Sequence, residues 1–203
     1  MSLDAETRTY SEKDSAVFLK TSERNGALSN MAPGFGLCIS GVDIRSSEAL
    51  YQASRFPHMP WVQEEIFAQA SPMTAKMKSK KYISNTRNDW IEVRVRIMKF
   101  CLRAKLVQNF EHFSEALINT GNIPIVEKKI RREDFWGAKV QSDGTLRGKN
   151  VLGRLLMELR DQVKTGVWRQ SSVIEPPNVC DFLILGKPVS SVTSSQKMME
   201  RFI

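Results

Sequence analysis

The chain has 203 residues, of which 41% are hydrophobic and 26% charged, and its formal net charge is +8, which is typical of a soluble globular protein with a substantial core. No apolar run approaches the length of a membrane span, and the first ten residues lack the apolar core of a signal peptide, so we expect a cytoplasmic protein with no membrane partner. Three widely separated cysteines (Cys38, Cys101 and Cys180), expected to be buried free thiols, and two isolated histidines (His58 and His112) argue against a metal site or a Ser-His-Asp triad.

Short strands and loops are predicted at the beginning of the chain. Residues 1–13 are polar, and we expect them to be frayed. Residues 16–20 and 36–42 have the composition of strands, and the glycine-rich segment 32–36 lies between them.

Helices dominate the middle of the chain. Ser46 or Ser47 is expected to cap the first helix. Pro60 begins the second helix and Pro72 the third, and Asn88 caps the longest one. The predicted helices span residues 48–56, 61–70, 73–81, 89–109, 110–119 and 149–164, and residues 123–129 are expected to be extended.

After Thr165 the composition shifts towards Ser, Val and Pro, and only residues 181–185 are predicted to form a strand. We therefore predict a flexible N-terminus at residues 1–13, one compact main domain at residues 14–165 and a C-terminal appendage at residues 166–203. The expected fold class is α+β, rich in helices and with a few short strands.

The long helix and the segment before it carry the excess positive charge. Between Lys76 and Lys105 there are ten Lys or Arg residues and two acids, which favours a polyanionic or phosphate-bearing partner. At about 100° per residue, Arg94 and Lys105 project on the side of the helix that should be buried. A buried cation is costly unless it is paired. Either both residues pair with internal acids, or they line a cavity floor and hold a phosphate or a ribose hydroxyl.

Residues 133–160 form the pattern that is most informative about function. Glu133 and Asp134 precede an aromatic pair and Gly137, and a flexible loop, a Gly-Lys-Asn turn and an amphipathic helix follow. An indole beside a helix N-terminus suits a phosphorylated ligand with a ring to stack on. The alternative is a tryptophan packed in the core, followed by an ordinary loop and a terminal helix.

Ordered motifs along the chain resemble the NADAR family of YbiA-like N-glycosidases. They are L-S-N-M at 28–31, S-S-E-A-L-Y-Q-A-S-R-F at 46–56, A-S-P-M-T-A-K-M at 70–77, N-D-W at 88–90, L-R-A-K-L at 102–106, E-D-F-W-G at 133–137, R-G-K-N-V-L-G at 147–153 and L-L-M-E-L-R at 155–160. The resemblance covers roughly residues 18–163. It implies a YbiA/NADAR-like catalytic domain that cleaves N-glycosidic bonds to ribose.

The resemblance also implies catalytic roles for four residues. Glu48 occupies the family's acid position in S-E-x-x-Y-Q, where a carboxylate can stabilise the charge that builds on ribose or activate water; its alternative role is to complement the helix dipole. Relatives usually have Asp three residues before the tryptophan of the W-G pair, where this chain has Glu133 with Asp134 beside it, so either is a candidate for the supporting acid. Lys20 is a candidate for Schiff-base attack on the opened ribose or, alternatively, a lysine at a strand edge.

Aromatic side chains in this family are expected to stack on a base or wall the pocket, and amides and glycines to contact ribose and phosphate. For Trp90, core packing is the alternative. The candidate binding residues are Asn30, Trp90, Arg94, Lys105, Trp136, Gly137, Gly148 and Asn150.

We therefore predict an N-glycoside hydrolase, without metal or cofactor, that acts on an ADP-ribosyl or phosphoribosyl group. The leading substrate is ADP-ribosylated guanine in nucleic acid, and a toxin partner would follow if the protein is an antitoxin. The alternatives are a hydrolase of phosphoribosyl-aminopyrimidine intermediates of riboflavin synthesis, a non-catalytic module that binds ADP-ribose or nucleic acid, and an interaction protein that assembles through its tail. The hydrolase hypothesis requires Glu48 and Trp136 to face one ribose-sized hollow.

Overall fold

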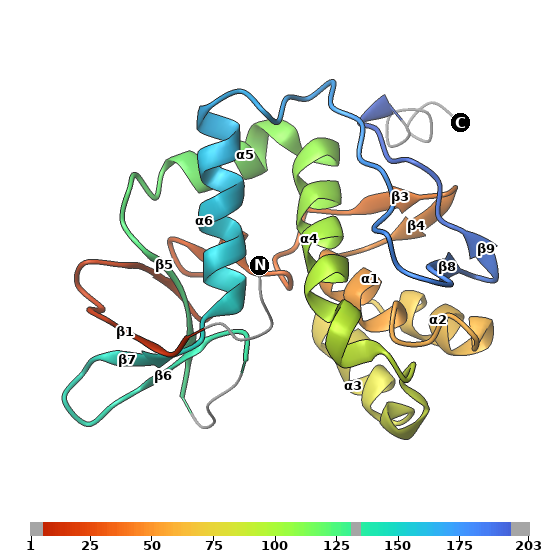
Figure 1. The fold of residues 1–203 in the computed structure, drawn as a ribbon, viewed down its shortest axis with the longest axis horizontal. Helices are drawn as coiled ribbons and strands as arrows, with labels where there is room; N and C mark the ends of the chain where they lie inside the picture. The colour runs from red at the N-terminus through yellow and green to blue at the C-terminus, as the bar shows by residue number, and fades with distance from the viewer. Residues whose placement is uncertain (1–5, 131–134, 196–203) are drawn as a thin grey trace. The chain divides into compact units, whose positions relative to one another are not determined.

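The computed structural model describes residues 6–130 and 135–195. These residues group into two compact units (Figure 1). We call residues 6–29, 111–130 and 135–168 the sheet unit, and residues 30–110 and 169–195 the helical unit. Helices and short strands are both present, so the predicted helix-rich α+β class is confirmed.

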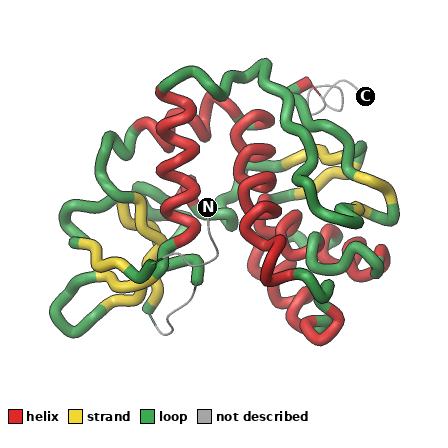
Figure 2. Tube along the Cα trace, in the orientation of Figure 1, coloured by secondary structure: helices red, strands yellow, loops and turns green. Residues whose placement is uncertain are grey.

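The sheet unit is built on a mixed five-stranded sheet with the strand order β1-β7-β6-β5-β2. Strand β5 pairs in parallel with β2 and β6, and the remaining pairs are antiparallel. Helix α6 packs on β5, and Figure 2 shows this helix in red beside the yellow strands of the sheet. The leucines along one side of α6 are buried. The elements are β1 (Arg8–Tyr10), β2 (Ala16–Phe18), η1 (Gly26–Leu28), α5 (Phe110–Ile118), β5 (Ile125–Lys129), β6 (Ala138–Val140), β7 (Leu146–Gly148) and α6 (Val151–Lys164).

The helical unit is organised around a short central helix, α1, which packs against α2, α3 and α4. Two small hairpins complete the unit. The elements are β3 (Leu37–Ile39), β4 (Val42–Ile44), α1 (Ser47–Ala53), α2 (Pro60–Phe67), α3 (Pro72–Lys80), η2 (Ile83–Asn85), α4 (Trp90–Gln108), β8 (Leu183–Ile184) and β9 (Lys187–Pro188). Among the described residues, no helix combines the length and hydropathy that a membrane crossing requires.

Two predicted single strands, residues 36–42 and 181–185, are instead parts of tight hairpins. In the first, Ser40 and Gly41 have φ of 52° and 77° and join β3 to β4. In the second, Leu185 and Gly186 have φ of 50° and 76° and join β8 to β9. Positive φ at both central residues matches the twist of a two-residue hairpin, which is why the chain turns back at these points.

Other local predictions also need correction. Residues 8–10 are not frayed but form β1, which pairs with β7, and Tyr10 is buried. The loop expected to be flexible before the last helix is the β6–β7 hairpin, in which the Asp143 carboxylate accepts hydrogen bonds from the backbone and hydroxyl of Thr145. Asn88 does not cap α4: Asp89 stands at the N-cap, and its carboxylate binds Arg87 instead.

Residues 169–195 belong to the helical unit through specific contacts. The buried Gln63 amide on α2 donates to the carbonyl of Leu183 and accepts from the amide of Leu185. Gln108 at the end of α4 donates to the carbonyl of Thr193. Cys180 is exposed, so the expectation that all three thiols are buried is wrong for this one.

Candidate functional site

Glu48 stands in the first turn of α1 and is only 6% exposed. The hydroxyl of Ser46 caps this helix by accepting from the amide of Ala49 at 3.2 Å. The amide of Glu48 donates to the carbonyl of Asn30 at 3.1 Å, which ties the loop before β3 to the start of the helix. The carboxylate is therefore held on a fixed backbone.

Three side chains from α1 and α3 form a chain of contacts on this carboxylate. Gln52 Nε2, one helical turn further on, donates to Glu48 Oε1 at 2.9 Å. The Ser79 hydroxyl on α3 donates to Gln52 Oε1, also at 2.9 Å. Lys76 Nζ lies 3.6 Å from the same Glu48 oxygen. Gln52 and Ser79 are 5% and 1% exposed, so their links to Glu48 are buried, whereas the side chain of Lys76 is 38% exposed.

One side of α4 faces the side of α1 that carries Glu48. The rings of Trp90 and Tyr51 are 5.0 Å apart between centroids. Burial raises the pKa of the Cys101 thiol, and the Glu48 carboxylate raises it further. Arg94 lies within electrostatic range of Tyr51. Residues 90, 94 and 101 share one face of a helix, so the predicted residues Glu48, Trp90 and Arg94 are brought together.

Arg55 completes this group, although the sequence did not single it out. Its guanidinium carbon lies 4.4 Å from the Trp90 ring centroid and 6.0 Å from that of Tyr51, a cation–π arrangement. Burial lowers the pKa of Arg55, and Tyr51 and Glu48 act in the opposite direction. Its Nε is buried and has no hydrogen-bond partner among the described residues. Arg55 could have been identified from the sequence, because the spacing of Glu48, Tyr51 and Arg55 by three and four residues places them on one face of a helix.

Asn30 is 4% exposed and lies beside the same helices. Its Nδ2 is 3.0 Å from the sulfur of Met98 on α4, a weak acceptor. Its Oδ1 is buried, and within the described part of the chain it has no hydrogen-bond partner. A hydroxyl of a ligand is the kind of group that would satisfy this oxygen, and that contact stays a prediction.

Lys105 is completely buried, as its position on the helix predicted. Its Nζ lies 4.2 Å from the centroid of the Phe35 ring, and burial lowers its pKa well below the usual value. Arg94 is only half-buried. Ligand contact by either cation stays a prediction.

In the sheet unit, backbone carbonyls close the N-terminus of α6. Phe135, Trp136 and Gly137 each supply one acceptor. These carbonyls accept hydrogen bonds from the backbone amides of residues 150–152. The sequence pattern suggested that amides at this helix N-terminus bind an anion, and for these three amides that interpretation is wrong. The hydrogen bonds are Asn150 N to Gly137 O at 3.0 Å, Val151 N to Phe135 O at 3.3 Å and Leu152 N to Trp136 O at 3.0 Å.

The Asn150 side chain is fully engaged with β5. The residue is 0% exposed and has a left-handed backbone, with φ of 47° and ψ of 44°. Its Nδ2 donates to the carbonyl of Ile125 at 2.8 Å, and its Oδ1 accepts from the amide of Glu127 at 3.1 Å. The amide thus joins the helix to the strand, and a contact between this residue and a ligand stays a prediction.

Gly137 and Gly148 lie where two strands approach closely. A Cβ on Gly148 would lie 2.4 Å from the carbonyl oxygen of Gly137 and 2.7 Å from Cα of Ala138. A Cβ on Gly137 would lie 2.5 Å from the carbonyl oxygen of Glu127. Both glycines are therefore required by neighbouring backbone, whatever further contact they make with a ligand.

The remaining predicted residues also belong to the sheet unit or lie outside the described residues. Trp136 is half-buried, with its ring 5.0 Å from that of Phe135 at an interplanar angle of 88°. Lys20 is exposed, just after β2. Glu133 and Asp134 lie outside the described residues. Because Glu48 is in the helical unit, a hollow that it shares with Trp136 stays a prediction.

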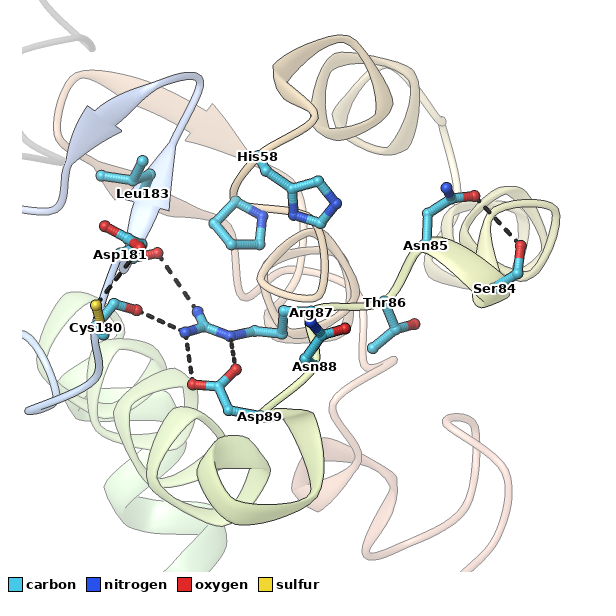
Figure 3. Close-up of a pocket in the computed structure, with 11 residues that line it drawn as sticks. His58, Ser84, Asn85, Thr86, Arg87, Asn88, Asp89, Cys180, Asp181 and Leu183 are labelled. Carbon is cyan, nitrogen blue, oxygen red and sulfur yellow. Dashed lines mark hydrogen bonds and ion pairs between the residues drawn. The ribbon is translucent and has the colours of Figure 1, made fainter.

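A separate cavity of about 510 Å³ lies in the helical unit, and Figure 3 shows the residues around it. Arg87 lines this cavity, and its guanidinium donates to both carboxylate oxygens of Asp89 and to the carbonyl of Cys180. No predicted site residue lines this cavity, so we keep it apart from the Glu48 group. Among the residues described here, no group of three or more His, Cys, Asp or Glu could hold a metal ion.

Comparisons with known proteins agree with the motif pattern. The model of the NADAR domain matches residues 17–164. The Escherichia coli protein named N-glycosidase YbiA is 34% identical over 146 residues, which cover 72% of this chain and 86% of that protein. A Vibrio vulnificus riboflavin biosynthesis protein is 31% identical over 163 residues, 80% of this chain, but the match spans only 42% of that protein's length. The NMR structure of E. coli YbiA superposes with a TM-score of 0.63 at 31% identity, covering 82% of this chain and 95% of the other.

Proposed function

Because this chain belongs to the NADAR domain family, we propose that it is a hydrolase of N-glycosidic bonds to ribose, with Glu48 as its principal carboxylate. The observation that carries the proposal is the environment of Glu48: a buried, hydrogen-bonded carboxylate beside Trp90, Tyr51 and Arg55. A carboxylate that is buried in this way can stabilise positive charge that develops beside it, because little water is present to screen the interaction.

The chemistry follows from the bond to be broken. When the bond between ribose C1 and nitrogen lengthens, positive charge develops on the sugar ring, and a carboxylate stabilises that charge or takes a proton from the attacking water. Trp90, which is 6% exposed and has Arg55 over its ring, is proposed as a contact for a base or sugar, and the cations Arg55 and Arg94 favour a phosphate-bearing substrate. Glu133 or Asp134 is proposed as the supporting acid, and Lys20 as a candidate covalent catalyst.

The leading substrate is an ADP-ribosyl group on guanine in nucleic acid. Its support is the concentration of Lys and Arg between residues 76 and 105, of which Arg87 and Lys105 are buried and the others are exposed or half-buried, because a basic surface attracts the phosphates of a nucleic acid. A toxin that attaches such a group would be the partner in that case. The proposed site of action is the cytoplasm.

A second candidate is the hydrolysis of a phosphoribosyl-aminopyrimidine intermediate of riboflavin synthesis. The similarity to a protein named for riboflavin biosynthesis favours it. The two candidates share the ribosyl C–N bond and differ in the group on either side of it, so the same carboxylate would serve both.

The test is to follow product release from a guanine-ADP-ribosylated oligonucleotide and from the phosphoribosyl-aminopyrimidine. Glu48→Gln should lower kcat at least about a hundredfold on the substrate that is cleaved. Glu92→Gln is the matched control, because Glu92 also stands in the first turn of a helix but is exposed. Cleavage of neither substrate, or normal turnover by Glu48→Gln, would overturn the proposal.

A further inference from the structure

The geometry points to Gln52 and Ser79 as positioning residues for Glu48: they hold one carboxylate oxygen in place and leave the other for the reaction. This inference rests on the proposed function, because it assigns Glu48 the catalytic role. Neither residue touches the substrate in this scheme. Both act through the carboxylate.

The two oxygens of Glu48 have different surroundings. Gln52 Nε2 and Lys76 Nζ both contact Oε1, at 2.9 Å and 3.6 Å. Oε2 accepts no hydrogen bond from the described residues. An oxygen that is already a hydrogen-bond acceptor is a poorer base than one that is not. Oε2 is therefore the oxygen that would take a proton or face the sugar cation.

The orientation of the Gln52 amide follows from its two neighbours. With the amide reversed, its carbonyl oxygen would face the carboxylate of Glu48, and two acceptors would meet without a proton between them. In the observed orientation the amide donates to Glu48 and accepts from Ser79 at 2.9 Å. The hydroxyl proton of Ser79 is shared between Gln52 Oε1 and the carbonyl of Lys76, which lies 2.8 Å away. Ser79 thus fixes Gln52, and Gln52 fixes Glu48.

The charges around Glu48 come from three helices and stay the same when Gln52 or Ser79 is replaced. A change in the pH–rate profile of these variants therefore reports the lost hydrogen bond. The surrounding ionisable groups are Tyr51 and Arg55 at α1, Lys76 on α3, and Arg94 and Cys101 on α4.

The experiment compares Gln52→Met and Ser79→Ala with matched controls. Gln63→Met removes an equally buried amide that binds only backbone groups. Ser54→Ala removes a hydroxyl from a serine that is also 1% exposed, and this hydroxyl also donates to a helix carbonyl, that of Leu50 at 2.8 Å, and not to the Gln52 side chain. The controls reproduce the loss of a buried polar group without the link to Glu48.

In the active enzyme, Gln52→Met should lower kcat about ten- to a hundredfold with KM unchanged, because a hydrogen bond to a charged group is lost. The acidic limb of the pH–rate profile should move up by about one pH unit. Ser79→Ala should lower kcat less, and both controls should keep the wild-type profile. Gln52→Glu should recover activity as the pH falls, since a protonated Glu at this position can again donate to Glu48.

Carbon-13 NMR of the glutamate carboxyls gives a second measurement that does not need turnover. The Glu48 resonance is assigned by its absence in Glu48→Gln, and its chemical shift at neutral pH should change in Gln52→Met, which loses the hydrogen bond to the carboxylate, but not in Gln63→Met. If the wild-type protein cleaves no N-glycoside, the proposed function fails and the chemical shift of the Glu48 carboxyl alone decides whether Gln52 holds Glu48. If Gln52→Met matches its control in both measurements, the inference is wrong.

Discussion

Replacement of Asn150 tests how the motif before α6 holds the sheet unit together. The residue combines a left-handed backbone with two hydrogen bonds to β5, one to the carbonyl of Ile125 and one from the amide of Glu127, and it is 0% exposed. Asn150→Ala removes both bonds and places an alanine in a conformation that it rarely adopts. The two lost partners cost about 1–3 kcal/mol each, and the left-handed backbone about 1–2 kcal/mol more.

Two further substitutions separate the cost of the lost hydrogen bonds from the cost of the left-handed backbone. Asn150→Gly loses the same bonds but adopts φ of 47° without strain, so it should be more stable than Asn150→Ala by about 1 kcal/mol. Asn150→Asp keeps the acceptor for Glu127 but turns a second oxygen towards the carbonyl of Ile125. Burial raises the pKa of such a carboxyl, so the folded variant holds the proton that the unfolded chain loses, and its stability should fall as pH rises.

Urea unfolding followed by circular dichroism measures the free energy of each variant, with Asn119→Ala as an exposed control expected within about 0.5 kcal/mol of wild type. The expected order of stability at neutral pH is wild type, Gly, Ala and then Asp. An Asn150→Ala protein within about 1 kcal/mol of wild type would refute the reasoning, because the Ile125 carbonyl and the Glu127 amide would then have lost their Asn150 partners at no cost.

Three other changes should have measurable effects. The difference in unfolding free energy between Lys105→Met and wild type should shift in favour of wild type as the pH rises from neutral to the usual lysine pKa, because burial lowers the pKa of Lys105 and the unfolded chain binds the extra proton in that range; a difference that does not vary with pH would contradict this. Gly148→Ala should lower stability by about 1–3 kcal/mol in thermal unfolding, since the new Cβ would lie 2.4 Å from the carbonyl oxygen of Gly137. Asp181→Asn should speed alkylation of Cys180 several-fold near neutral pH, because the Asp181 carboxylate raises the pKa of that thiol; equal rates, followed by mass spectrometry, would count against it.

The helices were predictable because their signals are local. Pro60 and Pro72 begin α2 and α3, and Ser46 caps α1 as one of the two expected candidates. The burial of Lys105 followed from helical spacing alone. Such features depend on residues within one or two turns of each other, so the sequence contains all the information that they require.

The strands were harder to predict because their partners are distant in the chain. Nothing near residues 8–10 indicates that β1 pairs with β7, almost 140 residues later. Two hairpins were taken for single strands, since Ser40 and Leu185 adopt positive φ although neither is a glycine. The aromatic and Gly-Lys-Asn motif suggested an anion site, but the carbonyls of residues 135–137 occupy the helix amides there.

By itself, the sequence determined the family, the α+β class and the burial of Lys105, because motif order and helical periodicity are properties of the chain alone. Only the tertiary structure decided what each side chain contacts: that Gln52 accepts from Ser79 while it donates to Glu48, that Arg55 lies over Trp90, and that Asn150 binds a strand. Those contacts join segments up to several tens of residues apart. They exist only after packing has removed the groups from water and required each buried donor to find an acceptor.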